Sequence, residues 1–307
     1  MKHIFILNPM AGKGDKIAAL RESIKETCER LGTDYLIYET TARYDAEDFV
    51  RKTAAESSER LRFYACGGDG TLGEVVNGVA GQVNAEVGLI PIGTGNDFVR
   101  NFADAGDFFD IEAQVMGEAR AIDLIKCNDR YGINVVNVGF DCEVVVKMDQ
   151  LRRNPLVPSK LTYATAIANN FFKKFGTRMK IFADDIEIDR DMMLCAIANG
   201  GFYGGGYNAA PRAALDDGLL DVCIVEKVTR AKFIGLIGSY KAGTHLESKA
   251  AEGCITYKKC KKVALEFPCE HNFCMDGEIE KYKRVDIEIK PKAIMFAVPK
   301  KNEEKNN

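Results

Sequence analysis

Three glycine-rich turns near the start of the chain carry residues suited to phosphate chemistry. They read Asn8-Pro9-Met10-Ala11-Gly12, Gly67-Gly68-Asp69-Gly70-Thr71 and Gly93-Thr94-Gly95-Asn96-Asp97. Glycine lets a backbone approach a phosphate closely, and a helix beginning near Thr71 would offer free N–H groups to an anion. The turns therefore predict a phosphate-binding edge. For any one of them the alternative is a plain tight turn between a strand and a helix.

Two of these turns also carry a carboxylate, Asp69 and Asp97. A carboxylate repels a phosphate directly, but Mg²⁺ between them takes one or two carboxylates together with phosphate oxygens. Thr71 and Thr94 add hydroxyl donors. None of the turns has the Walker A spacing or the Gly-x-Gly-x-x-Gly spacing, which disfavours P-loop NTPases and classical dinucleotide enzymes.

Acidic turns in the second half offer a different chemistry. Asp276-Gly277-Glu278 places two carboxylates where one could accept the proton of a hydroxyl group. On a strand both would face one side, whereas a turn at Gly277 would aim them together. Asp217-Gly218 is a similar pair. Asp-Gly is also a common hairpin signal, so both segments can be read as plain turns, and Asp217 either binds a metal or caps its turn.

Strands and helices alternate in the segments that must position the first set of turns. Apolar runs of strand type cover 3–7, 34–39, 61–66 and 87–91, and helical spacing covers 15–31, 45–58 and 71–80. This alternation predicts a parallel α/β sheet. In such a sheet the turns share the carboxyl edge, where ligands bind.

From residue 122 onward most segments resemble strands. These are 124–127, 132–139, 179–182, 192–199, 219–225, 262–267, 285–290 and 293–298, with helical stretches at 160–175 and 230–242. The pattern predicts an antiparallel β domain with inserted helices. We therefore expect an α/β domain at 1–121, to which 292–302 returns, and a β domain at 122–291.

Composition excludes some classes of protein. The chain has 307 residues and a net charge of −3, which gives no global basic field for nucleic acid. Its ten cysteines lack Cys-x-x-Cys spacing, so they indicate free thiols in a cytosolic protein rather than a zinc site. No apolar run reaches the ~20 residues of a membrane span.

Taken together, these motifs resemble the diacylglycerol kinase catalytic family, which includes bacterial soluble diacylglycerol kinases and sphingosine kinases. Gly67–Thr71 is the most specific element, supported in order by Asn8-Pro9, Gly93–Phe98, Asp216–Asp221 and Asp276–Glu278. The resemblance covers nearly the whole chain. It implies a phosphofructokinase-like nucleotide domain, a carboxyl-terminal β-sandwich, and ATP and lipid sites in the cleft between them.

The resemblance also assigns roles by position. Nucleotide contacts would come from Asn8, Pro9, Met10, Ala11, Gly12, Thr40, Gly68, Asp69, Gly70, Thr71, Leu72, Gly73, Glu74 and Thr94. Asp69 and Asp97 would organise the Mg²⁺–ATP network, and Glu278 or Asp276 would be the base, with Glu278 preferred. Asp217 and the carbonyls near Ala214 and Leu219 match a structural Mg²⁺ site. Ala11 stands where Ser is frequent, and Gly73 where Asn is frequent.

The implied reaction is phosphoryl transfer from ATP to the primary hydroxyl of a lipid, with diacylglycerol preferred. Basic residues interleaved with apolar ones in Lys160–Phe175, with Lys13, Lys16, Arg152 and Arg153 nearby, predict peripheral contact with an anionic membrane at its cytoplasmic face. A helix packed on the β domain is the alternative for that segment. A homodimer is expected by analogy.

Two other functions stay open at this point. One is an NAD kinase or another kinase of a soluble alcohol, because NAD kinases share the Gly-Gly-Asp-Gly loop. The other is a catalytically inactive nucleotide-binding regulator, against which the intact Asp97 and Asp276/Glu278 argue. The lipid itself is not identified by the sequence.

Overall fold

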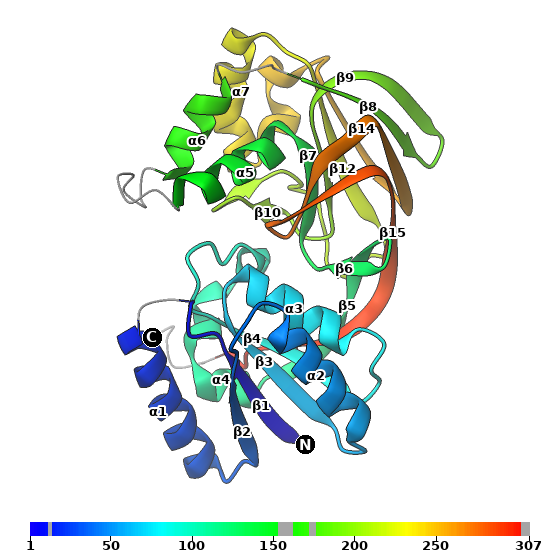
Figure 1. Cartoon of the computed structure of the whole chain (residues 1–307). Coiled ribbons are helices and arrows are strands. Elements are labelled where there is room, and N and C mark those ends of the chain that lie inside the picture. The colour runs from blue at the N-terminus through cyan, green and yellow to red at the C-terminus, as the bar shows by residue number, and fades with distance from the viewer. Residues whose placement is uncertain (12–13, 153–161, 172–175, 302–307) are drawn as a thin grey trace. The chain divides into compact units, whose positions relative to one another are not determined.

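The computed structural model describes residues 1–11, 14–152, 162–171 and 176–301. The chain divides into two compact units (Figure 1). Unit 1 comprises Met1–Leu124 and the chain from Lys290 onward, and unit 2 comprises Ile125–Ile289. Two strands, β5 (Glu118–Cys127) and β15 (Glu278–Val298), carry the chain from one unit into the other.

Unit 1 is built on a parallel sheet, as the alternation of strands and helices predicts. Its strands lie in the order β2-β1-β3-β4-β15, and each neighbouring pair is parallel. The first four strands are β1 (Lys2–Leu7), β2 (Tyr35–Glu39), β3 (Leu61–Gly67) and β4 (Ala85–Pro91). Because all run the same way, their carboxyl ends meet at one edge.

Helices cover both faces of this sheet (Figure 1). One face carries α1 (Gly14–Leu31) and α4 (Ile111–Val115), and the other carries α2 (Asp45–Glu56) and α3 (Asp69–Val79). Alternate strand residues such as Phe5 and Tyr64 pack against α1, because successive side chains of a strand point to opposite faces. The short 3₁₀ helices η1 (Phe98–Asn101) and η2 (Ala105–Phe109) follow β4.

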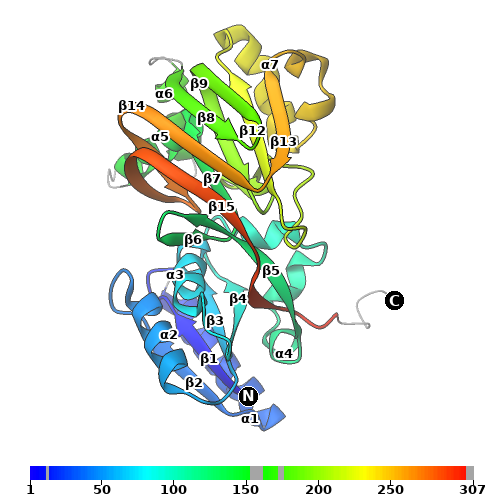
Figure 2. The ribbon, with the colours of Figure 1, turned by 90° about the vertical axis from the view of Figure 1, so that its right-hand side faces the viewer.

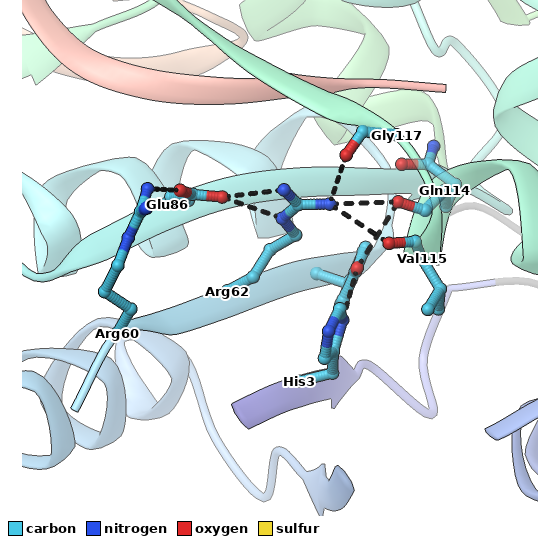
Figure 3. Close-up of polar contacts among 8 residues, drawn as sticks. His3, Arg60, Arg62, Glu86, Gln114, Val115 and Gly117 are labelled. Carbon is cyan, nitrogen blue, oxygen red and sulfur yellow. Dashed lines mark hydrogen bonds and ion pairs between the residues drawn. The ribbon is translucent and has the colours of Figure 1, made fainter. Parts of the chain in front are cut away.

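A buried ion network lies at the amino end of the same sheet (Figure 3). The Arg62 guanidinium lies 2.8 Å from Glu86 Oε2, and both side chains are 4% exposed. The same guanidinium donates to the carbonyls of Gln114, Val115 and Gly117 at 2.9–3.4 Å. Arg60 adds a second contact to Glu86 from the surface. This network ties β3 and β4 to the end of α4, on the side of the sheet away from the glycine-rich turns.

Unit 2 is an antiparallel β structure, as predicted. Long strands dominate it, and β14 (Lys262–Met275) and the first part of β15 form an extended hairpin (Figure 2). Its other strands are β6 (Arg130–Gly132), β7 (Val135–Gly139), β8 (Thr177–Ala183), β9 (Ile186–Ala198), β10 (Phe202–Tyr203), β11 (Tyr207–Asn208), β12 (Leu220–Glu226) and β13 (Ile255–Cys260).

The two faces of these strands bury different cores. Val136, Cys195 and Val222 face a core shared with β8, β14 and β15. Alternate residues, such as Ala196 and Cys223, instead pack toward the helices. Those helices are α5 (Phe140–Arg152), α6 (Thr162–Phe171) and α7 (Arg230–Ala242), with short 3₁₀ turns η4 (His245–Glu247) and η5 (Lys249–Ala251) nearby.

Three local expectations were wrong. The predicted strands 285–290 and 293–298 form one strand, β15, with the predicted break at Lys292 absorbed by a positive φ of 50°. The predicted strand 132–139 is interrupted between β6 and β7. The sequence pattern also missed α5, whose β-branched run Val144–Val146 resembles a strand but lies within a helix.

Candidate active site

The turns after the parallel strands are joined to one another at the carboxyl edge of unit 1. The Asn8 N–H donates to Cys66 O at 3.1 Å, and the Thr40 N–H donates to Leu7 O at 2.9 Å. The Gly93 N–H donates to Gly67 O at 3.1 Å. The structure therefore brings together the turns that follow β1, β2, β3 and β4.

Glycine is required here because two turns touch backbone to backbone. A Cβ added to Gly93 would lie 2.4 Å from Gly68 Cα, and one added to Gly67 would lie 2.2 Å from Thr71 Oγ1. Gly73 differs, because a Cβ there would meet nothing within 4 Å. The glycines between β3 and α3 thus set how closely the Gly93 turn approaches.

Asn8 organises the first turn through its side-chain amide. Its Nδ2 donates to Thr71 Oγ1 at 2.9 Å, and its Oδ1 accepts the Met10 N–H at 2.9 Å. The side chain therefore positions the Thr71 hydroxyl. Met10 is 89% exposed, as suits a turn open to a ligand. The predicted contact Gly12 lies outside the described residues.

The amino end of α3 offers backbone donors beside these turns. The helix begins at Asp69, and its cap residue Gly68 supplies no side-chain acceptor. The first N–H groups of a helix have no partner within it, which makes this end suited to an anion. Of the other predicted contacts on α3, the Leu72 side chain is fully buried, and Glu74 Oε2 accepts the Ala46 N–H at 3.2 Å.

Asp69 joins α3 to the turn after β4. Its carboxylate accepts the N–H groups of Asp97 and Phe98, each at 3.1 Å. A Cβ added to Gly95 would lie 3.1 Å from Asp69 Oδ2 and 3.6 Å from Asp97 Oδ2. Two carboxylate oxygens thus converge where the side chain of residue 95 would otherwise be. Asp97 Oδ1 also pairs with Arg100 Nε at 3.4 Å, so a Mg²⁺ ion that retains several waters would reach this carboxylate through Oδ2, the oxygen that faces Gly95. Thr94 is exposed at the tip of the turn.

In unit 2 the two carboxylates predicted to include the general base, Asp276 and Glu278, lie at a two-residue hairpin turn. Asp276 and Gly277 have φ values of 49° and 93°, and Met275 pairs with Glu278 across the turn. Two central residues with positive φ define the hairpin turn that Asp-Gly favours. The Asp276 carboxylate accepts three backbone N–H groups, from residues 133, 134 and 135, at 2.6, 3.1 and 2.8 Å. Glu278 is exposed at the start of β15.

The Asp217 turn contains a cation supplied by the chain itself. Asp217 Oδ2 lies 2.6 Å from Lys259 Nζ, and Asp217 Oδ1 accepts the Leu219 N–H at 3.0 Å. Lys259 Nζ also lies 3.1 Å from Asp221 Oδ2. Ala214 is half-buried in the loop that leads into this turn.

The helix layer of unit 2 contains a polar group that sequence reasoning missed. Asp141 accepts a hydrogen bond from the Tyr203 hydroxyl, which lies 3.2 Å from the Tyr240 hydroxyl. Around Asp141 is an apolar recess whose free volume is about 20 Å³, lined by residues that include Ile167 and Leu236. Burial raises the pKa of Asp141 to about 6. No sequence signal distinguishes Asp141 from a surface acid.

The segment predicted to touch a membrane is described only in part. Within α6, Ile167 lines the apolar recess, and the Phe171 ring lies 6.0 Å from that of Phe233. These apolar side chains pack inside unit 2, as in the alternative of a packed helix. Lys16, which belongs to the same prediction, is exposed on α1. The remaining residues of that prediction have side chains outside the described part of the structure: Lys13, Arg152, Arg153, Lys160, Leu161, Tyr163, Phe172, Lys173 and Lys174. Among the helices described, none combines the length and apolar character of a membrane span.

Comparisons with known proteins cover both units. Residues 2–127 match the diacylglycerol kinase catalytic domain, and residues 134–298 match the YegS C-terminal NAD kinase beta sandwich-like domain. A diacylglycerol kinase of Staphylococcus epidermidis is 30% identical over 284 residues, covering 89% of this chain and 84% of that protein. A diacylglycerol kinase of Bacillus subtilis is 28% identical over 89% of this chain and 88% of that protein.

A solved structure shares the fold. The crystal structure of a diacylglycerol kinase from Bacillus anthracis aligns with a TM-score of 0.74 over 96% of each chain, at 23% sequence identity. A protein of Shewanella frigidimarina named "Probable lipid kinase YegS-like" is 28% identical over 82% of this chain and 80% of that protein.

Proposed function

The chain belongs to the diacylglycerol kinase family of lipid kinases, and on that premise we propose that it transfers the γ-phosphoryl group of ATP to the primary hydroxyl of a lipid. Diacylglycerol is the proposed acceptor, because the relatives from Bacillus subtilis and Staphylococcus epidermidis are named for it. The proposed ATP site rests on one observation. The Asp69 carboxylate joins the two glycine-rich turns beside the amino end of α3.

The nucleotide phosphates would lie along the carboxyl edge of unit 1. Backbone N–H groups at the start of α3 and the Thr71 and Thr94 hydroxyls would donate to phosphate oxygens. Met10 and Ala11 would contribute backbone from the first turn, and Asn8 would hold the Thr71 hydroxyl in place.

Asp69 and Asp97 would hold Mg²⁺, either directly or through water. The ion would neutralise charge on the phosphates during transfer. Asp69 also has a structural role, because both its oxygens accept backbone N–H groups. We therefore assign the positioning of the turns to Asp69, and assign to Asp97 the closer role in the reaction.

Glu278 is the proposed base. The lipid hydroxyl gives its proton to the Glu278 carboxylate as its oxygen bonds to the γ-phosphorus. The bond from that phosphorus to the β–γ bridging oxygen breaks, and ADP leaves. Asp276 is a poorer base, because its oxygens already accept three backbone N–H groups and hydrogen bonds to a carboxylate favour its charged form. Asp276 would instead position the hairpin that carries Glu278.

The apolar layer between the sheet and helices α5–α7 would take the acyl chains. Its recess has a free volume of only about 20 Å³, so these helices must part for a chain to enter. The preference for a lipid acceptor over a sugar or NAD rests on the family match. The proposed place of work is the cytoplasmic face of a membrane, where such a lipid presents its hydroxyl.

The experiment that tests the function is phosphoryl transfer from ATP labelled at the γ position. The purified chain is incubated with diacylglycerol, ceramide, a sphingoid base, phosphatidylglycerol, NAD and glycerol, and the products are separated by chromatography. We expect label in phosphatidic acid. Label in NAD or glycerol but in no lipid would overturn the proposal, and ATP binding without any labelled product would indicate a regulator.

A matched pair of variants tests the base. Glu278→Gln keeps size and hydrogen bonding but cannot take a proton, so kcat should fall about 100- to 10,000-fold. Glu280→Gln, two residues along the same strand, is the control and should keep its activity. Equal activities in the two variants would contradict the assignment of Glu278.

A further inference from the structure

The Asp217 turn differs from the metal site that the family resemblance implies. We propose that the Lys259 ammonium is the resident cation of this turn and that the turn binds no divalent metal. The inference concerns unit 2 alone and does not depend on which acceptor the kinase uses.

The carboxylate oxygens of Asp217 and Asp221 already lie beside groups of the chain itself. Asp217 Oδ1 accepts the Leu219 N–H at 3.0 Å, and Asp217 Oδ2 meets Lys259 Nζ at 2.6 Å. Asp221 Oδ1 accepts the Tyr257 hydroxyl at 2.7 Å, and Asp221 Oδ2 meets Lys259 Nζ at 3.1 Å. Lys259 thus bridges the two acids in the way that a bound ion would.

The fold holds this lysine in place. Lys259 and Asp221 are directly opposite each other in the antiparallel pair of β13 and β12. The Asp221 side chain is 1% exposed, so a buried negative charge requires a cation at this place.

A divalent ion in the same turn would meet the ammonium at close range. Mg²⁺ binds carboxylate oxygens at about 2.1 Å, and Lys259 Nζ lies 2.6 Å from Asp217 Oδ2. An ion on that oxygen would lie no more than about 5 Å from the ammonium. Both charges are positive, and Mg²⁺ loses its water shell reluctantly, so the ion would have to expel the lysine.

Thermal unfolding of the full chain without nucleotide tests the proposal. The wild-type protein should melt at the same temperature in EDTA and in millimolar MgCl₂. Lys259→Ala should melt several degrees lower, because two acids lose their cation. Lys262→Ala is the control: it removes a lysine that is 77% exposed and 3.9 Å from Glu288, and should leave the melting temperature unchanged.

Two results would overturn the inference. One is a wild-type melting temperature that rises with Mg²⁺, with the rise retained in Asp97→Asn and lost in Asp217→Asn. The other is an unchanged melting temperature for Lys259→Ala. If Lys259→Ala does not fold, equilibrium dialysis against Mn²⁺ decides. Equal binding by the wild type and Asp217→Asn supports the ammonium, and one ion fewer in Asp217→Asn overturns it.

Discussion

The Asp69 carboxylate accepts the backbone N–H of Asp97 at 3.1 Å and thereby fixes the distance between two turns that are 28 residues apart in sequence. The bond is charge-assisted, and the same carboxylate takes the N–H of Phe98 at 3.1 Å. One side chain thus has two roles: it supports the turns and supplies charge beside the proposed metal.

These two roles of Asp69 can be separated by substitution. Asp69→Ala should lower the free energy of unfolding by about 2 kcal/mol, because it loses both charged hydrogen bonds. Asp69→Asn keeps an acceptor and should lose less stability. Both should lose about 10- to 100-fold in activity, since the negative charge is gone in each. Urea unfolding and kinetics measure the two effects.

The control for Asp69 is Asp104→Asn. Asp104 forms an exposed ion pair with Lys301, and such pairs contribute little. An Asp69→Asn variant with full activity would show that this carboxylate only supports the turns.

Asp276 is predicted to matter for stability rather than for proton transfer. Asp276→Ala leaves three N–H groups without their acceptor and places alanine at a φ of 49°, so unfolding should become easier by about 3 kcal/mol. Asp276→Asn tolerates this φ and keeps one oxygen, so it should cost less. Glu278→Gln should leave the urea midpoint unchanged. If Asp276→Asn is fully stable yet as inactive as Glu278→Gln, Asp276 is the base.

The ion network of Figure 3 predicts unequal costs for two substitutions of its members. Glu86→Gln leaves the Arg62 guanidinium buried without a counter-charge and should cost about 3–5 kcal/mol. Arg60 touches the same carboxylate but is 69% exposed, so Arg60→Ala should cost less than about 1 kcal/mol. Urea unfolding measures both, and equal losses would contradict the role given to burial.

Asp141 predicts a pH dependence of stability. Burial raises its pKa in the folded protein to about 6, above the value of 3.8 expected when unfolded. The unfolded chain therefore releases this proton at a lower pH than the folded protein does. As the pH rises from 3.8 toward 6, the free energy of unfolding falls. Asp141→Asn cannot ionise. It should therefore be more stable than the wild type by about 2 kcal/mol at about pH 8, with a smaller difference at about pH 5.

Unfolding by urea across this pH range, wild type against Asp141→Asn, measures the effect. Asp104→Asn, which removes an exposed acid, should show no comparable pH trend. A stability difference between Asp141→Asn and the wild type that does not change with pH would mean that the acid has its ordinary pKa.

Some of this structure could be predicted from residue order. The parallel sheet of unit 1 follows from apolar runs ending in glycine-rich turns, and α7 from its helical spacing. Helix α5 could not be predicted, because the run Val144–Val146 favours a strand and packing overrides that preference.

The contacts that the site residues make could not be predicted from local sequence patterns either. Lys259 meets Asp221 only because β12 and β13 pair in a particular register. Asp276 meets residues 133–135 only because β14 pairs with β7. The sequence marks which residue types are present, but cross-strand register decides what each side chain touches.

The Asp276 turn has a consequence for the order of events during folding. Its carboxylate bonds to a residue 141 positions earlier, so the hairpin with Glu278 cannot be fixed by local structure alone. Contacts this distant in sequence form slowly, because the ends of a long loop must first be brought together. A chain leaving the ribosome would complete β1, β3 and the glycine-rich turns long before residue 278 is made. The chain would therefore become able to transfer a phosphoryl group only after residue 278 has been synthesised.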